Sequence, residues 1–161
     1  TDHFDPKSNV VRLSDSTYSS TSVAAIGVAA HEVGHAVQYA EGYMPIKLRN
    51  AIVPVVQVAS YAAWPLAILG VILSFERLAV FGVLLFLAVV IFQIITLPVE
   101  FNASSRALKT LEGTMLLDSD ELKASKKVLS AAAMTYVAAT VVAIANLLRL
   151  LAITGVGRRR D

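Results

Sequence analysis

Apolar residues along this chain are gathered in long runs that follow a polar beginning. Residues 1–22 are mostly polar and rich in turn formers, so they predict a strand-and-loop region with a short strand at about 10–13. From 23 to 40 nearly every position is apolar, which predicts a helix buried on all sides. Serine and threonine at 19–22 are candidate N-caps for this helix, and Gly42 marks its end.

Two further apolar runs follow, 51–75 and 78–97, and the charged pair Glu76 and Arg77 separates them. The second run has 20 residues, which at about 1.5 Å per residue covers the roughly 30 Å hydrocarbon layer of a bilayer. We therefore expect a membrane hairpin, whose two outer ends lie on the same side of the membrane.

The remaining chain predicts two more helices. One runs from 100 to 112, and a C-terminal helix runs from 119 to 154. Asp118 and Glu121 form a capping-box pattern at the start of the C-terminal helix. Its alanine-rich apolar stretch is long enough to make it a candidate third span. The whole chain, 1–161, is expected to form a single domain.

Composition supports a membrane protein. The apolar fraction is 56% and the mean hydropathy is +0.65, whereas soluble domains are about 45–50% apolar. A chain of 161 residues cannot bury such an excess in its own core, so a lipid bilayer is the expected partner. A net charge of +2 gives no footprint for nucleic acid, and the absence of cysteine excludes thiolate metal sites. The predicted fold class is a mainly α, multi-pass membrane protein.

Positive charges predict an orientation in the cell membrane. The hairpin turn carries only Arg77, whereas the other basic residues fall on the side of the 23–40 helix: Lys47, Arg49, Arg106, Lys109 and the lysines at 123–127. The excess of lysine and arginine on cytoplasmic segments then places this side in the cytoplasm. If the last helix crossed the membrane, the cluster at 158–160 would lie outside, against the same rule, and the sequence leaves this conflict open.

The helix at 23–40 carries the sequence His31-Glu32-Val33-Gly34-His35, an HExxH pattern. Histidines four residues apart lie on one helix face, so both imidazoles can bind one zinc ion. Glu32 points to a neighbouring sector, where it can act as general base toward a metal-bound water. The alternative is a pair of core histidines satisfied by hydrogen bonds, with Glu32 in an ion pair.

A catalytic zinc ion needs a third protein ligand and one open position. Glu100 is the best candidate, because the hairpin returns it to the side of the two histidines. The alternative role for Glu100 is that of an acid in the first turn of a helix. Glu41 and Glu112 are weaker candidates for the same ligand position.

Several stretches together resemble the neutral zinc metallopeptidase family of bacterial membrane proteins. The strongest are VAAHEVGHAVQ at 28–38 and LPVEFNASSRAL at 97–108, and the others are DHFDP at 2–6, VRLS at 11–14 and LSAAAMTYVA at 129–138. The resemblance runs along essentially the whole chain. Members of this family usually carry an N-terminal membrane segment before the part that begins here, so we expect this chain to lack one.

The resemblance implies a zincin-like active-site region that hydrolyses peptide bonds with a single zinc ion. His31, His35 and Glu100 correspond to the ligands and Glu32 to the base. Related membrane proteases often have an aspartate four residues after the ligand glutamate, where this chain has Ser104. Residues with a candidate supporting role at the site are Ser104, Asn102, Arg106 and His3.

The predicted function is that of a zinc-dependent membrane metalloendopeptidase, acting on peptides or membrane proteins. One alternative is a non-catalytic zinc-binding membrane scaffold or regulator, but structural zinc would not require Glu32. Another is a transport-type helical bundle. The polar groups are confined to one end of the apolar runs, which argues against a pathway along them.

Overall fold

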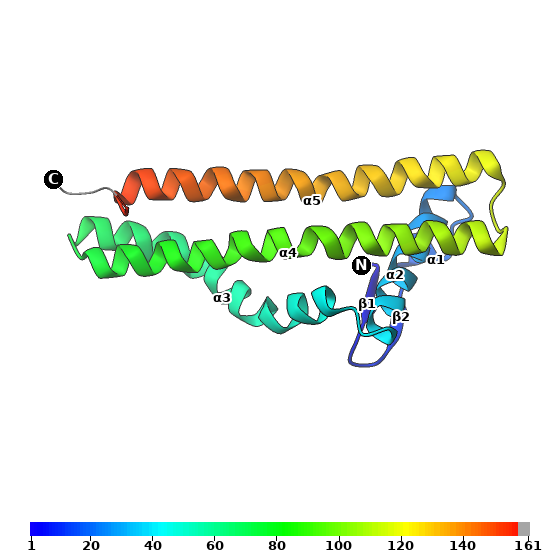
Figure 1. Cartoon of the computed structure of the whole chain (residues 1–161), viewed down its shortest axis with the longest axis horizontal. Coiled ribbons are helices and arrows are strands. Elements are labelled where there is room, and N and C mark those ends of the chain that lie inside the picture. The colour runs from blue at the N-terminus through cyan, green and yellow to red at the C-terminus, as the bar shows by residue number, and fades with distance from the viewer. Residues whose placement is uncertain (158–161) are drawn as a thin grey trace. The chain divides into compact units, whose positions relative to one another are not determined.

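A computed structural model describes residues 1–157 and shows a mainly helical protein (Figure 1). A two-stranded sheet at the N-terminus is followed by one short helix and four longer ones. The predicted fold class is confirmed. The arginine cluster at 158–160 lies outside the described residues.

The N-terminal strands are β1 (His3–Asp5) and β2 (Val10–Arg12), paired antiparallel with Phe4 opposite Val11. The strand at 10–13 was predicted, but β1 was not. Asp5 closes the connecting turn by accepting hydrogen bonds from the backbone of Lys7 and from the hydroxyl of Ser8. A four-residue helix, α1 (Asp15–Tyr18), follows.

Helix α2 spans Val23–Ala40, as predicted, and the Ser22 hydroxyl caps it by accepting a 3.2 Å hydrogen bond from the amide of Ala25. The expectation of burial on all sides is wrong for the described chain, since Val33 is 40% exposed. Small residues let neighbouring helices approach one face of α2 closely, and only that face is buried. Its buried residues are Gly27, Ala30, Gly34, His35 and Gln38.

Helix α3 spans Met44–Ile72 and contains Pro54 and Pro65. It begins earlier and ends earlier than the predicted run at 51–75. The residues from 44 to 50 favour helix once a helix follows them, because a helix grows more easily than it nucleates.

Helix α4 is continuous from Glu76 to Thr114. The sequence predicted two elements here, at 78–97 and 100–112, and that division is wrong. Pro98 lies inside the helix, where it removes one backbone donor and its ring crowds the carbonyl four residues earlier. Apolar helices that pack against neighbours tolerate this loss.

Helix α5 spans Ser119–Thr154, again as predicted. The capping box is formed reciprocally. The Glu121 amide donates to Asp118 Oδ1 at 2.8 Å, and the Asp118 amide donates to Glu121 Oε2 at 3.0 Å. Helices α3, α4 and α5 are each long and apolar enough to cross a membrane.

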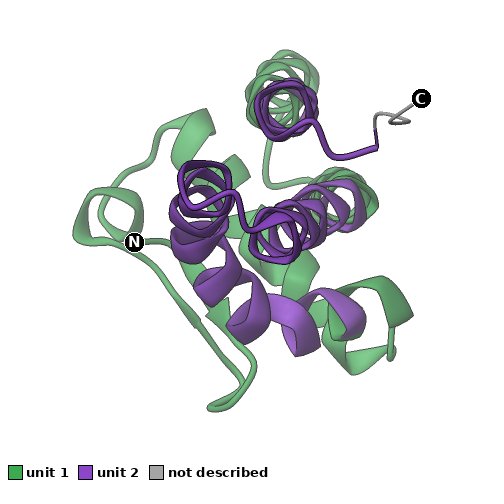
Figure 2. Cartoon of the chain, turned by 90° about the vertical axis from the view of Figure 1, so that its left-hand side faces the viewer, with its two compact units in different colours: residues 1–47, 97–136 green, residues 48–96, 137–161 purple. Residues whose placement is uncertain are grey.

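The chain forms two compact units, each built from two stretches (Figure 2). Unit 1 comprises residues 1–47 and 97–136, and unit 2 comprises residues 48–96 and 137–161. The start of α3 and the end of α4 both belong to unit 1, as a hairpin requires. All predicted site residues also lie in unit 1.

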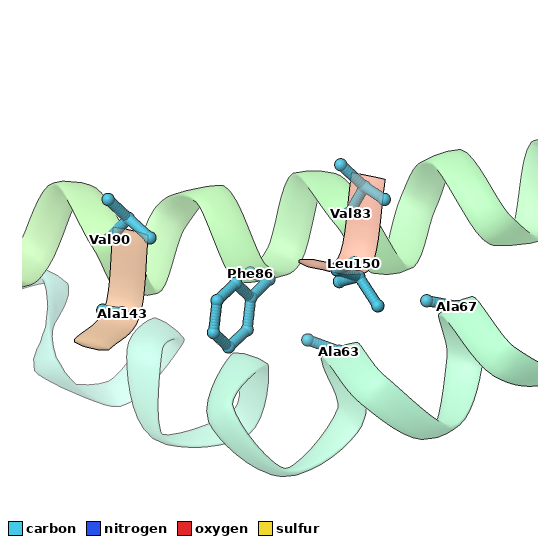
Figure 3. Packing of buried hydrophobic residues seen from close by; sticks show 7 residues of the cluster. All are labelled: Ala63, Ala67, Val83, Phe86, Val90, Ala143 and Leu150. Atoms are coloured by element: carbon cyan, nitrogen blue, oxygen red, sulfur yellow. The ribbon is translucent and has the colours of Figure 1, made fainter. Parts of the chain in front are cut away.

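Unit 2 has a core of small and branched side chains from three helices (Figure 3). A β-carbon added to Gly82 of α4 would lie 2.5 Å from the backbone nitrogen of Ala67 in α3. The two arms of the hairpin therefore approach at backbone distance. The core residues are Ala63, Ala67, Val83, Phe86, Val90, Ala143 and Leu150.

Candidate metal centre

Helix α2 places His31 and His35 one turn apart on the same face. Their rings meet edge to face, with centroids 4.7 Å apart. His35 is buried and His31 is partly buried. The α-helical spacing of four residues is the direct cause of this pairing.

Glu100 of α4 completes a cluster with the two histidines. Its Oε2 atom lies 3.1 Å from His31 Nε2 and 3.6 Å from His35 Nε2, and the residue is 3% exposed. Ligand atoms around a tetrahedral zinc ion at ordinary bond lengths are about 3.4 Å apart. One carboxylate and two imidazoles at these separations fit the donor set of a catalytic zinc site.

Gly34 allows α2 and α4 to approach closely enough for this cluster. A β-carbon at Gly34 would lie 2.5 Å from the carbonyl oxygen of Ala103. Any side chain here would force the helix that carries His31 and His35 away from the helix that carries Glu100. Gly34, the second variable residue of the HExxH pattern, is therefore under a steric constraint that the sequence pattern alone does not reveal.

Ser104 lies one helical turn after Glu100 and reaches the outer nitrogen of a histidine. Its Oγ is 3.1 Å from His31 Nδ1, which leaves Nε2 of the same ring facing Glu100. The residue that replaces the aspartate of related proteases therefore still contacts a candidate ligand. A hydroxyl makes this contact without adding a second buried negative charge beside Glu100.

Gln38 makes the corresponding contact to His35, and this role was not predicted from the sequence. Its Oε1 is 3.0 Å from His35 Nδ1, and its Nε2 donates to the carbonyl of Val99 and to Asn102 Oδ1. The side chain is fully buried. The one signal in the sequence was a glutamine on an otherwise apolar helix, one turn after His35.

Asn102 and Arg106 extend this network to the surface. Arg106 Nε donates to Asn102 Oδ1 at 2.7 Å, and its Nη1 pairs with Glu41 Oε2 at 2.6 Å. The guanidinium also lies over the ring of Tyr43, 5.9 Å from its centroid. Glu41, a rival for the third ligand, is thus engaged with Arg106, and the other rival, Glu112, is exposed on α4.

Glu32 lies beside the two histidines in sequence but outside the group of three donor atoms that converge. Its Oε2 accepts a 3.0 Å hydrogen bond from the backbone amide of Phe4 in β1. His3, a candidate from the sequence, is exposed and its Nδ1 is 2.8 Å from the Thr1 carbonyl. Strand β1 therefore contacts Glu32 through the backbone amide of Phe4 and not through the imidazole of His3.

The chain is similar to known proteins along nearly its whole length. Residues 1–155 match the family described as "Putative neutral zinc metallopeptidase". The chain is 49% identical over 158 residues to "Putative membrane protease YugP" of Bacillus subtilis (strain 168), covering 98% of this chain and 70% of that protein. No solved structure matches the chain significantly. This chain therefore belongs to the putative neutral zinc metallopeptidase family, as its sequence resemblance indicated.

Proposed function

We propose that the protein is a zinc-dependent membrane metalloendopeptidase that hydrolyses peptide bonds in peptides or membrane proteins. The observation that carries this proposal is the convergence of His31, His35 and Glu100, with Glu32 next to His31 in the sequence and outside the cluster. Three protein ligands leave one coordination position open, which is the arrangement of catalytic rather than structural zinc.

In this proposal His31, His35 and Glu100 hold one zinc ion. When bound, zinc supplies a Lewis acid that polarises a carbonyl group and increases the acidity of water. Glu32 takes the proton of the attacking water and passes it to the departing amine. The Phe4 amide holds Oε2 of Glu32, so the backbone of β1 fixes the position of the base.

Two alternatives predict different outcomes. A zinc-binding scaffold would need the three ligands but would gain nothing from a carboxylate at position 32. A transport bundle would need polar groups along its spans, whereas the described ionisable cluster lies in unit 1, and the buried core of unit 2 is apolar.

The test combines metal analysis with hydrolysis of casein by the purified protein. We expect one zinc ion per chain, and we expect His31→Ala or Glu100→Ala to remove it. Glu32→Gln should retain zinc and lose hydrolysis by at least a hundredfold, in keeping with the contribution of a positioned base.

Glu112→Gln is the matched control, because it neutralises an exposed glutamate on the same helix as Glu100. It should retain both zinc and activity. Full hydrolysis by Glu32→Gln would refute the role of the base. Zinc binding without any hydrolysis by the unaltered protein would favour the scaffold.

We also propose that the protein is a multi-pass protein of the cell membrane, with the site at its cytoplasmic face. Unit 1, which contains the site, carries most of the positive charge of the described chain, whereas the opposite end of α4 carries Arg77 in its first turn. The basic residues of unit 1 outside the N-terminal hairpin are Lys47, Arg106, Lys109, Lys123, Lys126 and Lys127.

A further inference from the structure

The amide of Gln38 is held on three sides by groups whose hydrogen-bonding roles differ. Its Nε2 lies 2.8 Å from the Val99 carbonyl and 2.9 Å from Asn102 Oδ1, while its Oε1 lies 3.0 Å from His35 Nδ1. The side chain is completely buried, so water cannot substitute for any of these partners. The direction of each hydrogen bond is therefore determined by the partners alone.

That direction can be followed from the surface inward. Arg106 has no acceptor, so its Nε donates to Asn102 and must face the amide oxygen of that residue. Gln38 Nε2 donates one hydrogen to this Asn102 oxygen and the other to the Val99 carbonyl. Both hydrogens of the Gln38 amide are therefore used. Only the oxygen of Gln38 remains for His35, so His35 Nδ1 must carry the proton.

His31 differs from His35 in the partner of Nδ1, while Nε2 of both rings faces the Glu100 carboxylate, at 3.1 Å for His31 and 3.6 Å for His35. Its Nδ1 faces the hydroxyl of Ser104, which can donate or accept, and its Nε2 lies 3.1 Å from the Glu100 carboxylate. Without a metal, His31 can donate from Nε2 to Glu100 and accept from Ser104 at Nδ1. If Nε2 bound a metal, Nδ1 would carry the proton of the neutral ring and would donate a hydrogen bond to Ser104 Oγ.

We propose that Gln38 is a positioning residue that holds His35 in its Nδ1–H form, with the Nε2 lone pair directed at the metal position before any metal binds. His31 keeps both tautomers accessible. His35 is thus preorganised for metal binding, whereas His31 can change its tautomer. The proposal rests on the proposed zinc site only for the identity of the metal, because the tautomer of His35 is a property of the metal-free protein.

The chain has three histidines, so their ring nitrogens can be resolved by ¹⁵N NMR of histidine-labelled protein in detergent micelles. At pH 8, where free imidazole is neutral, the metal-free protein should show a protonated Nδ1 and an unprotonated Nε2 for His35. His31 should show a protonated Nε2 that becomes unprotonated when zinc is added. A protonated Nε2 on His35 in the metal-free protein would overturn the proposal, and this measurement needs no variant.

Gln38→Met removes the acceptor while keeping the length of the side chain. We expect His35 to lose its fixed tautomer and zinc to bind 10–100-fold more weakly in a chelator competition. Gln57→Met, at an exposed position in α3, is the control and should change neither result. An unchanged His35 tautomer in folded Gln38→Met would refute the role of Gln38. If His35 has the expected tautomer but zinc does not bind, the zinc proposal fails and the role of Gln38 stands.

Discussion

Gly34 of α2 and Ala103 of α4 approach so closely that a β-carbon at Gly34 would lie 2.5 Å from the Ala103 carbonyl oxygen. The obstacle is backbone, which cannot rotate aside as a flexible side chain would. The same pair of helices carries all three candidate ligands. The packing of α2 against α4 therefore sets the separation between the two histidines and Glu100.

Gly34→Ala should consequently damage both stability and metal binding. We expect unfolding to require about 1–3 kcal/mol less, because the added methyl overpacks a backbone contact. Zinc affinity should fall at the same time, since α2 must move relative to Glu100. Denaturant unfolding in micelles and chelator competition would measure the two effects.

Gly113→Ala provides the control for this substitution. Gly113 lies near the end of α4, and a β-carbon there would meet no atom within 4 Å. Replacing a helical glycine with alanine should stabilise the helix by up to about 1 kcal/mol and leave zinc affinity unchanged. Equal behaviour of the two variants would contradict the steric role of Gly34.

Ser104→Ala should weaken zinc binding by removing the partner of His31 Nδ1. We expect a loss of about 10-fold, at the lower end of the range for outer hydrogen-bond partners, because the lost contact is a neutral hydroxyl. The neighbouring Ser105 is exposed, whereas Ser104 is buried, so Ser105→Ala should have no effect. Identical affinities for both variants would show that the contact between Ser104 and His31 contributes nothing.

The helices whose ends are marked by capping residues were predictable from the sequence. Ser22 and Gly42 delimit α2, and Asp118 with Glu121 delimits the start of α5, because caps are local interactions between residues close in the chain. Pro98 lies between the two elements predicted at 78–97 and 100–112, yet α4 continues through it, because tertiary packing outweighs the local cost of a proline in a helix. β1 was missed because a three-residue strand carries too little alternation to be distinguished from loop.

The cluster of candidate ligands was predictable for a similar reason. His31 and His35 are linked by helical spacing, and Glu100 follows from the hairpin. Gln38 was not predictable, since its partner Val99 contributes a backbone carbonyl 61 residues away, and no side-chain pattern reports a backbone acceptor. The Phe4 amide, which contacts Glu32, was missed on the same grounds.

The turn of the N-terminal hairpin should loosen in acid. The Ser8 hydroxyl and the Lys7 amide donate to the Asp5 carboxylate, and they lower the pKa of Asp5 from 3.8 to about 2. Because the folded pKa is the lower one, the stabilisation is complete well above pH 3.8 and is lost as the pH falls from about 4 toward 2.

Ser8→Ala removes the largest cause of this shift and should raise the pKa of Asp5 back toward 3.8. An NMR titration of the Asp5 carboxyl carbon would measure the change. Ser20→Ala, which alters a hydroxyl that does not contact Asp5, should leave the value near 2. A Ser8→Ala titration that matches the unaltered protein would assign the low pKa to another cause.

The two ends of α4 offer a direct test of the proposed orientation in the membrane. Exposed glutamates stand at both ends, Glu76 and Glu112, and about 54 Å of helix separates them, more than the roughly 30 Å hydrocarbon layer. The chain has no cysteine, so Glu76→Cys and Glu112→Cys each introduce a single reactive thiol. With the site facing the cytoplasm, a membrane-impermeant maleimide should label Glu76→Cys on intact cells and Glu112→Cys only after permeabilisation. The reverse pattern would invert the orientation, and labelling of both variants on intact cells would show that α4 does not span the membrane.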